Sequence, residues 1–406
     1  MKDKRQKSPL RISHALASHG REEEKRVLKV LREHRTIIGR ETQEFESRVA
    51  NIFGKKYGIM VNSGSSANLL AIELLNLPRG SEVITPVLTF ATTVAPLVQK
   101  GLIPVFVDVV EGKYTIDEDK LEAAISKKTK ALMVPTLMGN LPNLEKLQKI
   151  AKKYNLYYID DSCDSLGSLY KGKPPGAYSY ISTTSTYGSH IITSGGNGGV
   201  LMVDSEELRD RAKVLRGWGR TSAIFAETEN IEIRLLSKIG KMPYDGKFIF
   251  EEVGYNLLPM ELGSAFGNAQ LDKLNTFIKI RDRNAKILIN FFSKYPDYFL
   301  TPVVDKDCKA RFLYFPITIK KKAPFTRLEF VIFLEKNNIQ TRPIFTGNIL
   351  KQPGFKNIPH RDTQKEYPVT DHIMENGVII GLHQGLTMEH LDRLMEVVND
   401  FLKQNT

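Results

Sequence analysis

A single histidine, His190, lies in a polar, glycine-rich stretch of the sequence that runs from position 181 to position 203. Six serine or threonine residues precede it between positions 182 and 189, and four glycines follow it within Gly195–Gly199. Small residues and hydroxyl donors let backbone and side chains converge on an anionic ligand. Because imidazole exchanges protons near neutral pH, this stretch could place a base beside such a ligand.

Three more groups that could bind a ligand or take part in a reaction follow expected strands. Gly64 and Ser65 stand between a strand at 57–62 and a helix, whose first N–H groups could hold a phosphate. Phe90 follows a strand at 82–86, and Asp161 ends a strand at 156–161. Taken singly, these features are more often a helix cap, a core aromatic and a paired buried acid.

Together with the histidine loop, the three groups fit a phosphorylated heteroaromatic cofactor. The helix start at Gly64 and Ser65 and the loop hydroxyls would hold the cofactor's phosphate. The Phe90 ring would stack on the cofactor's ring, and Asp161 would keep a nitrogen of that ring protonated. A carboxylate buried at a strand end needs such a partner, because its desolvation is costly. Pyridoxal phosphate is a cofactor of this kind.

The elements that must position these groups alternate regularly. Apolar strands expected at 57–62, 82–86, 103–109, 131–136 and 156–161 are separated by helices at 63–77, 92–99, 117–126 and 142–154. This alternation predicts an α/β fold with a parallel sheet covered on both faces. In such sheets ligands bind at the carboxyl ends of the strands, where the four groups are expected.

The sequence as a whole predicts three units. They are an N-terminal arm and helix over 1–40, a large cofactor-binding domain over 41–275, and a small C-terminal α+β domain over 276–406. Helical periodicity covers 22–49, and a strand pair spans 179–203. A polar, irregular excursion at 221–250 interrupts the large domain. We expect that excursion to be a lid or an interface arm.

Composition excludes several classes of protein. The 406 residues include 58 basic and 46 acidic ones, a net charge of +12, but the basic residues are scattered and form no nucleic-acid-binding motif. A solvated basic surface is the simpler explanation, and attraction of a phosphorylated substrate is the alternative. No run of about 18 apolar residues or signal peptide is present, so we expect a cytoplasmic protein without a membrane span.

Cysteine usage restricts the redox chemistry. The chain has two cysteines, Cys163 and Cys308. An iron–sulfur cluster normally requires about four thiolates, which this chain alone does not supply.

Five runs of sequence resemble one family over most of the chain, from about Gly39 to the C-terminus. They are GRETQEFESRVANIFGKKYGIMVNSGSSANLLAIELL, IDDSCDSLG, STTSTYGSHIITSGGNGGVLMV, RGWGR and VGYNLLPMELGSAFGNAQL. They are similar to the DegT/DnrJ/EryC1/StrS family of fold-type-I enzymes that depend on vitamin B6. The resemblance implies a mostly parallel seven-stranded sheet in the large domain and a homodimer with shared sites.

The resemblance also implies roles for individual residues. Gly64, Ser65 and Ser185 would hold the phosphate of pyridoxal or pyridoxamine phosphate, Phe90 would stack on its ring, and Asp161 would pair with the ring nitrogen. Three further residues would act around this core: Asp164 stands where aminotransferases often have glutamine, Asn256 would reach the neighbouring subunit's cofactor, and Arg342 is a candidate substrate contact. His383 is a second candidate substrate contact. For Arg342 and His383 a surface or structural role is nearly as good an explanation.

The position of the Schiff-base lysine carries the main departure from the aminotransferases. The chain has His190 there, and no lysine lies between Lys173 and Lys213. The resemblance is therefore to the nucleotide-sugar 3-dehydratase branch. In that branch pyridoxamine phosphate condenses with a nucleotide-diphosphate 4-keto-6-deoxyhexose, histidine acts as the base, and the C3 hydroxyl leaves, as 3,6-dideoxysugar biosynthesis requires.

Two departures from that branch refine the prediction. The excursion at 221–250, which resembles that of the iron–sulfur type, contains no cysteine. We therefore predict an enzyme without an iron–sulfur cluster that restores its amine from L-glutamate. The turn Gly195–Gly199 reads GGNGG, one residue longer than the G-E-G-G usual in the branch. A non-catalytic homologue that binds a nucleotide sugar or supports a partner enzyme, and a nucleotide-sugar aminotransferase, stay open as alternatives.

Overall fold

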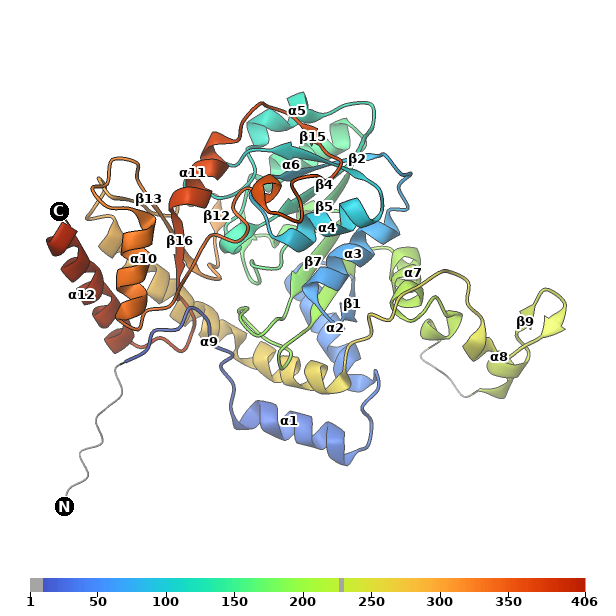
Figure 1. The fold of residues 1–406 in the computed structure, drawn as a ribbon. Helices are drawn as coiled ribbons and strands as arrows, with labels where there is room; N and C mark the ends of the chain where they lie inside the picture. The colour runs from blue at the N-terminus through green and yellow to red at the C-terminus, as the bar shows by residue number, and fades with distance from the viewer. Residues whose placement is uncertain (1–9, 226–229, 406) are drawn as a thin grey trace, which may run out of the picture.

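An eight-stranded sheet forms the centre of the protein in the computed structural model, which describes residues 10–225 and 230–405 (Figure 1). Its strand order is β1-β8-β7-β5-β4-β2-β3-β15, and only β8 runs antiparallel to its neighbours. The strands are β1 (Tyr57–Val61), β2 (Glu82–Pro86), β3 (Ile103–Val107), β4 (Thr129–Pro135), β5 (Tyr157–Asp161), β7 (Ile181–Ser185), β8 (Gly199–Val203) and β15 (Arg361–Asp362).

The predicted α/β class and mostly parallel sheet are confirmed. Seven strands come from the large domain, as expected. The eighth, β15, belongs to the C-terminal part of the chain and pairs with the edge strand β3. It is fixed there by Arg361, whose guanidinium lies 2.8 Å from the Glu82 carboxylate. A strand of two residues carries no periodic sequence signal, which explains why the sequence did not predict it.

Helices cover both faces of the sheet, as the alternating pattern predicts. One buried cluster joins β1 and β7 to α3 (Gly64–Leu74) and α7 (Glu206–Arg216). Another joins β2, β3 and β4 to α5 (Leu121–Ala124) and α6 (Leu144–Lys153). Helix α4 (Ala91–Gln99) follows β2.

Two helices precede the sheet where the periodicity predicts one helical stretch. They are α1 (Arg21–Arg32) and α2 (Arg40–Ile52). The break contains His34 at φ 55°, a left-handed conformation that ends α1, and Gly39, which caps α2. Both helices pack against the long helix α9 (Glu261–Phe292).

Helix α9 connects the large domain to the C-terminal region, and the predicted boundary between residues 275 and 276 lies inside it. The C-terminal region has a four-stranded antiparallel sheet in the order β11-β13-β16-β14. Its elements are β11 (Phe299–Leu300), β13 (Phe315–Ile319), α10 (Arg327–Lys336), β14 (Thr341–Arg342), α11 (Pro368–Asn376), β16 (Gly377–Ile380) and α12 (Met388–Asn405).

Two peripheral segments complete the fold. The excursion contains α8 (Ile231–Leu235) and the hairpin of β9 (Lys238–Ile239) and β10 (Met242–Pro243), and it projects from the large domain beyond α7 (Figure 1). The N-terminal segment runs beside the C-terminal sheet, where the fully buried Ile12 pairs with Ile339. None of the helices in the described residues is both long and apolar enough to span a bilayer.

Candidate functional site

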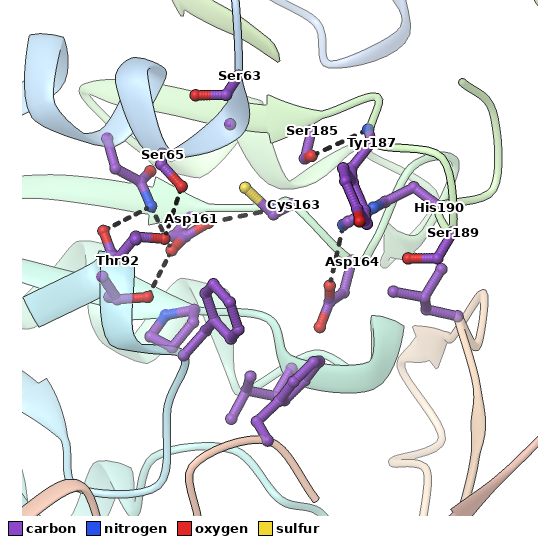
Figure 2. A pocket seen from close by; sticks show the side chains of 18 of the residues that line it. Ser63, Ser65, Thr92, Asp161, Cys163, Asp164, Ser185, Tyr187, Ser189 and His190 are labelled. Carbon is purple, nitrogen blue, oxygen red and sulfur yellow. Dashed lines mark hydrogen bonds and ion pairs between the residues drawn. The ribbon is translucent and has the colours of Figure 1, made fainter. Parts of the chain in front are cut away.

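A cavity of about 370 Å³ opens at the carboxyl ends of β1, β4, β5 and β7, where the sequence predicts a site (Figure 2). We call it the inner cavity. All of the predicted phosphate, ring and base residues line it. Its walls include Ser63, Gly64, Ser65, Asn68, Phe90, Thr93, Asp161, Cys163, Asp164, Ser185, Tyr187, Ser189, His190, Asn197, Tyr314 and Phe345.

The first turn of α3 forms a cradle at one end of the inner cavity. Ser63 caps the helix by accepting a hydrogen bond from the Ser66 N–H at 3.1 Å. A Cβ atom on Gly64 would lie 2.6 Å from the Ser185 Cβ, so only glycine leaves the cradle open. A helix start that lines the cavity, flanked by the hydroxyls of Ser65 and Ser185, is a fitting receptor for a phosphate group.

Asp161 presents a buried carboxylate at the end of β5. Its Oδ2 accepts hydrogen bonds from Asn68 Nδ2 and Thr93 Oγ1, both at 2.8 Å, whereas its Oδ1 lies at a longer 3.4 Å from the Cys163 backbone nitrogen. Burial raises the pKa of this carboxyl group. A cationic ring N–H at the less occupied oxygen would offset the cost of burying the charge.

The adjacent acid, Asp160, serves a different purpose. It is fully buried and accepts hydrogen bonds from the Ser162 hydroxyl at 2.7 and 2.8 Å. Burial raises its pKa to about 7. Asp160 does not line the inner cavity, so of the two acids that end β5 the fold presents Asp161.

His190 stands across the cavity in the turn between β7 and β8. Its Nε2 lies 3.6 Å from Asp164 Oδ1, and its buried Nδ1 has no hydrogen-bond partner (Figure 2). Asp164 is held by the Met138 N–H at 3.0 Å. Because neither ring nitrogen of His190 makes a hydrogen bond of normal length, the imidazole is available for proton transfer.

Aromatic residues that the sequence analysis did not assign complete the inner cavity. The Tyr187 ring meets the His190 ring edge to face at 6.1 Å, and the Tyr314 hydroxyl donates to Ser189 Oγ at 2.9 Å. Burial raises the pKa of Tyr314 to about 12. Proximity to His190 in the sequence could have identified Tyr187, but no pattern connects Tyr314 or Phe345 to this site.

The inner cavity fits a vitamin-B6 phosphate. It joins a phosphate cradle, a buried carboxylate and the half-exposed Phe90 ring in one space. Among the described residues that line it there is no lysine, so His190 has no competing amine nearby. The described residues contain no cluster of three His, Cys, Asp or Glu side chains suited to a metal ion.

A second space, which we call the outer cavity, adjoins the inner one and measures about 500 Å³. Phe90, Tyr314 and Phe345 line both cavities. The outer cavity is also lined by His14, Ala91, Arg342, Pro343, Thr346, Gln352, Gly354, Phe355 and Ile379. The candidate substrate contact Arg342 therefore lies beside the inner cavity, not in it.

The other two predicted contacts lie outside both cavities. Asn256 is exposed and pairs through its backbone with Gly217. His383 is 3% exposed, with its Nε2 3.0 Å from the Ser13 carbonyl oxygen. Burial, together with the charge of Arg281, lowers the pKa of His383 to about 4.

The fold and the inner cavity define a protein of the aminotransferase class that is built for a vitamin-B6 cofactor. Sequence comparison is more specific: the chain belongs to the DegT/DnrJ/EryC1/StrS aminotransferase family, which it matches over residues 17–399. This confirms the family that the sequence runs predict.

Two relatives are similar to this chain over most of their length. The chain is 37% identical to the lipopolysaccharide biosynthesis protein RfbH of Salmonella typhimurium, covering 90% of this chain and 86% of the relative. It is 36% identical to the dTDP-4-dehydro-2,6-dideoxy-D-glucose 3-dehydratase of Saccharopolyspora spinosa, covering 92% of this chain and 83% of the relative.

Two solved structures share the fold closely. One is the GDP-4-keto-6-deoxy-D-mannose 3-dehydratase of E. coli with bound hydrated PLP, with a TM-score of 0.86, 29% identity, and coverage of 96% of this chain and 100% of that chain. The other is a GDP-4-keto-6-deoxymannose 3-dehydratase with a trapped PLP–glutamate geminal diamine, with a TM-score of 0.86, 30% identity, and coverage of 95% and 99%.

Proposed function

We propose that this protein is a pyridoxal/pyridoxamine-phosphate-dependent nucleotide-sugar 3-dehydratase. Its substrate would be a nucleotide-diphosphate 4-keto-6-deoxyhexose, from which the C3 hydroxyl is removed. The observation that carries the proposal is His190, which stands with Asp164 in a cavity whose described lining has a phosphate cradle and a buried aspartate but no lysine. The dehydratase relatives and structures support the same reaction class.

The residues of the inner cavity divide the work of cofactor binding. Gly64, Ser65 and Ser185 would hold the phosphate at the start of α3. Asp161, fixed through its Oδ2 by Asn68 and Thr93, would keep the ring nitrogen protonated. When bound in its amine form, the cofactor supplies the amine that condenses with the C4 ketone and an electron sink for loss of the C3 substituent.

His190 would move the protons of this reaction. As a neutral imidazole it accepts a proton from carbon, and as imidazolium it returns one to the departing hydroxyl, which leaves as water. Asp164, 3.6 Å from Nε2, stabilises the charged ring between the two transfers. Tyr187 and the hydrogen bond from Tyr314 to Ser189 restrict the turn that carries the histidine.

With two cysteines in the sequence, the protein would work without an iron–sulfur cluster of its own. L-glutamate would restore the amine form, in line with the PLP–glutamate geminal diamine trapped in the related dehydratase structure. We also propose a homodimer, in which Asn256 on the exposed surface would reach the partner's site.

The test is a product assay by mass spectrometry. The cofactor-loaded protein is incubated with CDP-, GDP- and dTDP-4-keto-6-deoxyhexoses, each with and without glutamate. We expect a 3-deoxy product from one of them, formed repeatedly only with glutamate. An amino-sugar product would identify an aminotransferase instead, and no product from a protein that binds the cofactor would support a non-catalytic homologue.

A further inference from the structure

The inner and outer cavities differ in the charges that line them. Asp161 and Asp164 face the inner cavity. The described lining of the outer cavity has no Asp or Glu, but it includes the cationic residue Arg342 and His14, whose imidazole can take up a proton. A space with cationic or potentially cationic groups and no acids attracts anions, and Arg suits the paired oxygens of a phosphate.

His14 reaches the outer cavity because the N-terminal segment is docked on the C-terminal region. Ile12, which is fully buried, donates its N–H to the Asn338 carbonyl at 2.9 Å and accepts from the Gln340 N–H at 2.8 Å. The next residue but one, His14, then packs its ring on Tyr314 with the ring centres 5.9 Å apart. Tyr314 lines both cavities, so His14 stands at their junction.

The hydrogen bonds of His14 determine which of its nitrogens can bind a ligand. Gln340 Oε1 accepts from the His14 backbone N–H at 3.2 Å and lies 3.1 Å from His14 Nδ1. Because an amide oxygen only accepts, Nδ1 carries a proton. Within the described residues Nε2 makes no hydrogen bond like that of Nδ1, and in a charged ring it would be a donor toward an anion.

We propose that His14 and Arg342 bind the diphosphate of the nucleotide sugar in the outer cavity while the sugar extends past Phe90 and Tyr314 into the inner cavity. This inference rests on the proposed function and specifies its substrate end. Phe355 gives the nucleoside an apolar wall in the same space. The N-terminal segment is then part of the substrate site, although it lies more than 300 residues from Arg342 in the sequence.

The carboxylates of glutamate are the other anions that this enzyme would meet, so the experiment measures both ligands. Calorimetry of the full-length, PLP-loaded protein gives the affinity for CDP, GDP, UDP and dTDP. The rate of conversion of the aldehyde to the amine form, followed by absorbance, gives the KM for glutamate. The variants are His14→Ala, His14→Phe and Arg342→Ala, with His19→Ala as a matched control, because His19 is exposed on the same segment and lines neither cavity.

We expect His14→Ala and Arg342→Ala each to weaken binding of the preferred diphosphate at least tenfold, with the KM for glutamate unchanged. His14→Phe keeps a ring on Tyr314 and should weaken binding as much as His14→Ala does. His19→Ala should match the wild type in both measurements.

Three results would overturn the inference: wild-type affinity in both alanine variants, restored affinity in His14→Phe, or a raised glutamate KM with unchanged diphosphate affinity. The last result would assign the outer cavity to the amino donor. Failure of the proposed function gives a different result. In that case the protein binds a diphosphate through His14 and Arg342 but forms no 3-deoxy product, so the binding site is supported and the proposed reaction is not.

Discussion

The inner and outer cavities adjoin each other but are built in different ways. The inner cavity is formed mainly by residues at the carboxyl ends of β1, β4, β5 and β7, and its acid Asp161 is held by two short hydrogen bonds. The outer cavity is assembled from the N-terminal segment, the start of α4 and the C-terminal region. Regular elements thus fix the proposed cofactor end, whereas the proposed substrate end depends on how distant segments dock. A change in nucleotide preference therefore need not disturb cofactor binding.

The strongest test of this division is the substitution His190→Asn. It should lower the dehydration rate about 10³-fold, since general acid–base catalysis by one residue contributes roughly 10²–10⁴-fold. Cofactor absorbance and nucleoside diphosphate affinity should stay at wild-type values, because neither the cradle nor the outer cavity changes. Steady-state kinetics and calorimetry measure the two effects.

The variant His190→Lys is the companion to that test. A lysine there should capture the aldehyde form of the cofactor as a borohydride-reducible adduct. Dehydration should be lost in the same variant. Dehydration that survives either substitution would show that another residue is the base.

The next largest effect should come from Asp161→Asn. It removes the charge that would pair with the ring nitrogen and should weaken cofactor affinity about 10- to 100-fold, the range for a hydrogen bond to a charged group. Asp160→Asn is the matched control, because Asp160 ends the same strand but lies outside both cavities. Absorbance titration with pyridoxal phosphate compares the two, and equal losses would mean that the strand end, not the charge, matters.

A smaller effect on cofactor affinity should come from adding a single methyl group to one cavity or the other. In Gly64→Ala the new Cβ would lie 2.6 Å from the Ser185 Cβ, so the cradle must shift and cofactor affinity should fall about tenfold. Gly354→Ala is the comparison, because a Cβ there meets nothing within 4 Å and the residue lines only the outer cavity. Cofactor affinity that falls equally in both variants would contradict separate cofactor and substrate ends.

The same contrast explains what the sequence could predict. The alternation of apolar strands and helices placed Gly64, Phe90 and Asp161 at one edge of a sheet, because the carboxyl ends of parallel strands meet there. The order of helices and strands along the chain does not predict where His14 or Tyr314 lies relative to that edge. These residues reach the outer cavity only through tertiary packing and a backbone pairing that no local pattern encodes.

The two histidines singled out from the sequence show a further limit. His190 and His383 each have a buried Nδ1 without a hydrogen-bond partner. The Nε2 of His190 faces Asp164 in the inner cavity, whereas the Nε2 of His383 donates to the Ser13 carbonyl. Residue type alone could not separate the proposed base from a buried, neutral ring, because the difference lies in the neighbours that the fold supplies.

His383 therefore supplies the smallest prediction, which concerns stability and leaves catalysis alone. Its pKa is about 4 in the folded protein, because burial and the nearby Arg281 disfavour the charged ring, against about 6.5 in an unfolded chain. Between these values the unfolded chain binds a proton that the folded protein does not. The free energy of unfolding should therefore decrease as the pH falls from about 6.5 to 4.

The substitution His383→Gln tests this linkage, because glutamine retains a donor for the Ser13 carbonyl but does not titrate. Chemical denaturation at several pH values should give a shallower loss of stability between pH 6.5 and 4 than in the wild type, while kcat stays unchanged. His19→Gln is the matched control, since it removes an exposed ring instead of a buried one. An unchanged pH slope in His383→Gln would show that this ring does not limit stability in acid. A raised KM for the nucleotide sugar in that variant would instead make His383 part of the substrate end and move the boundary between the two cavities.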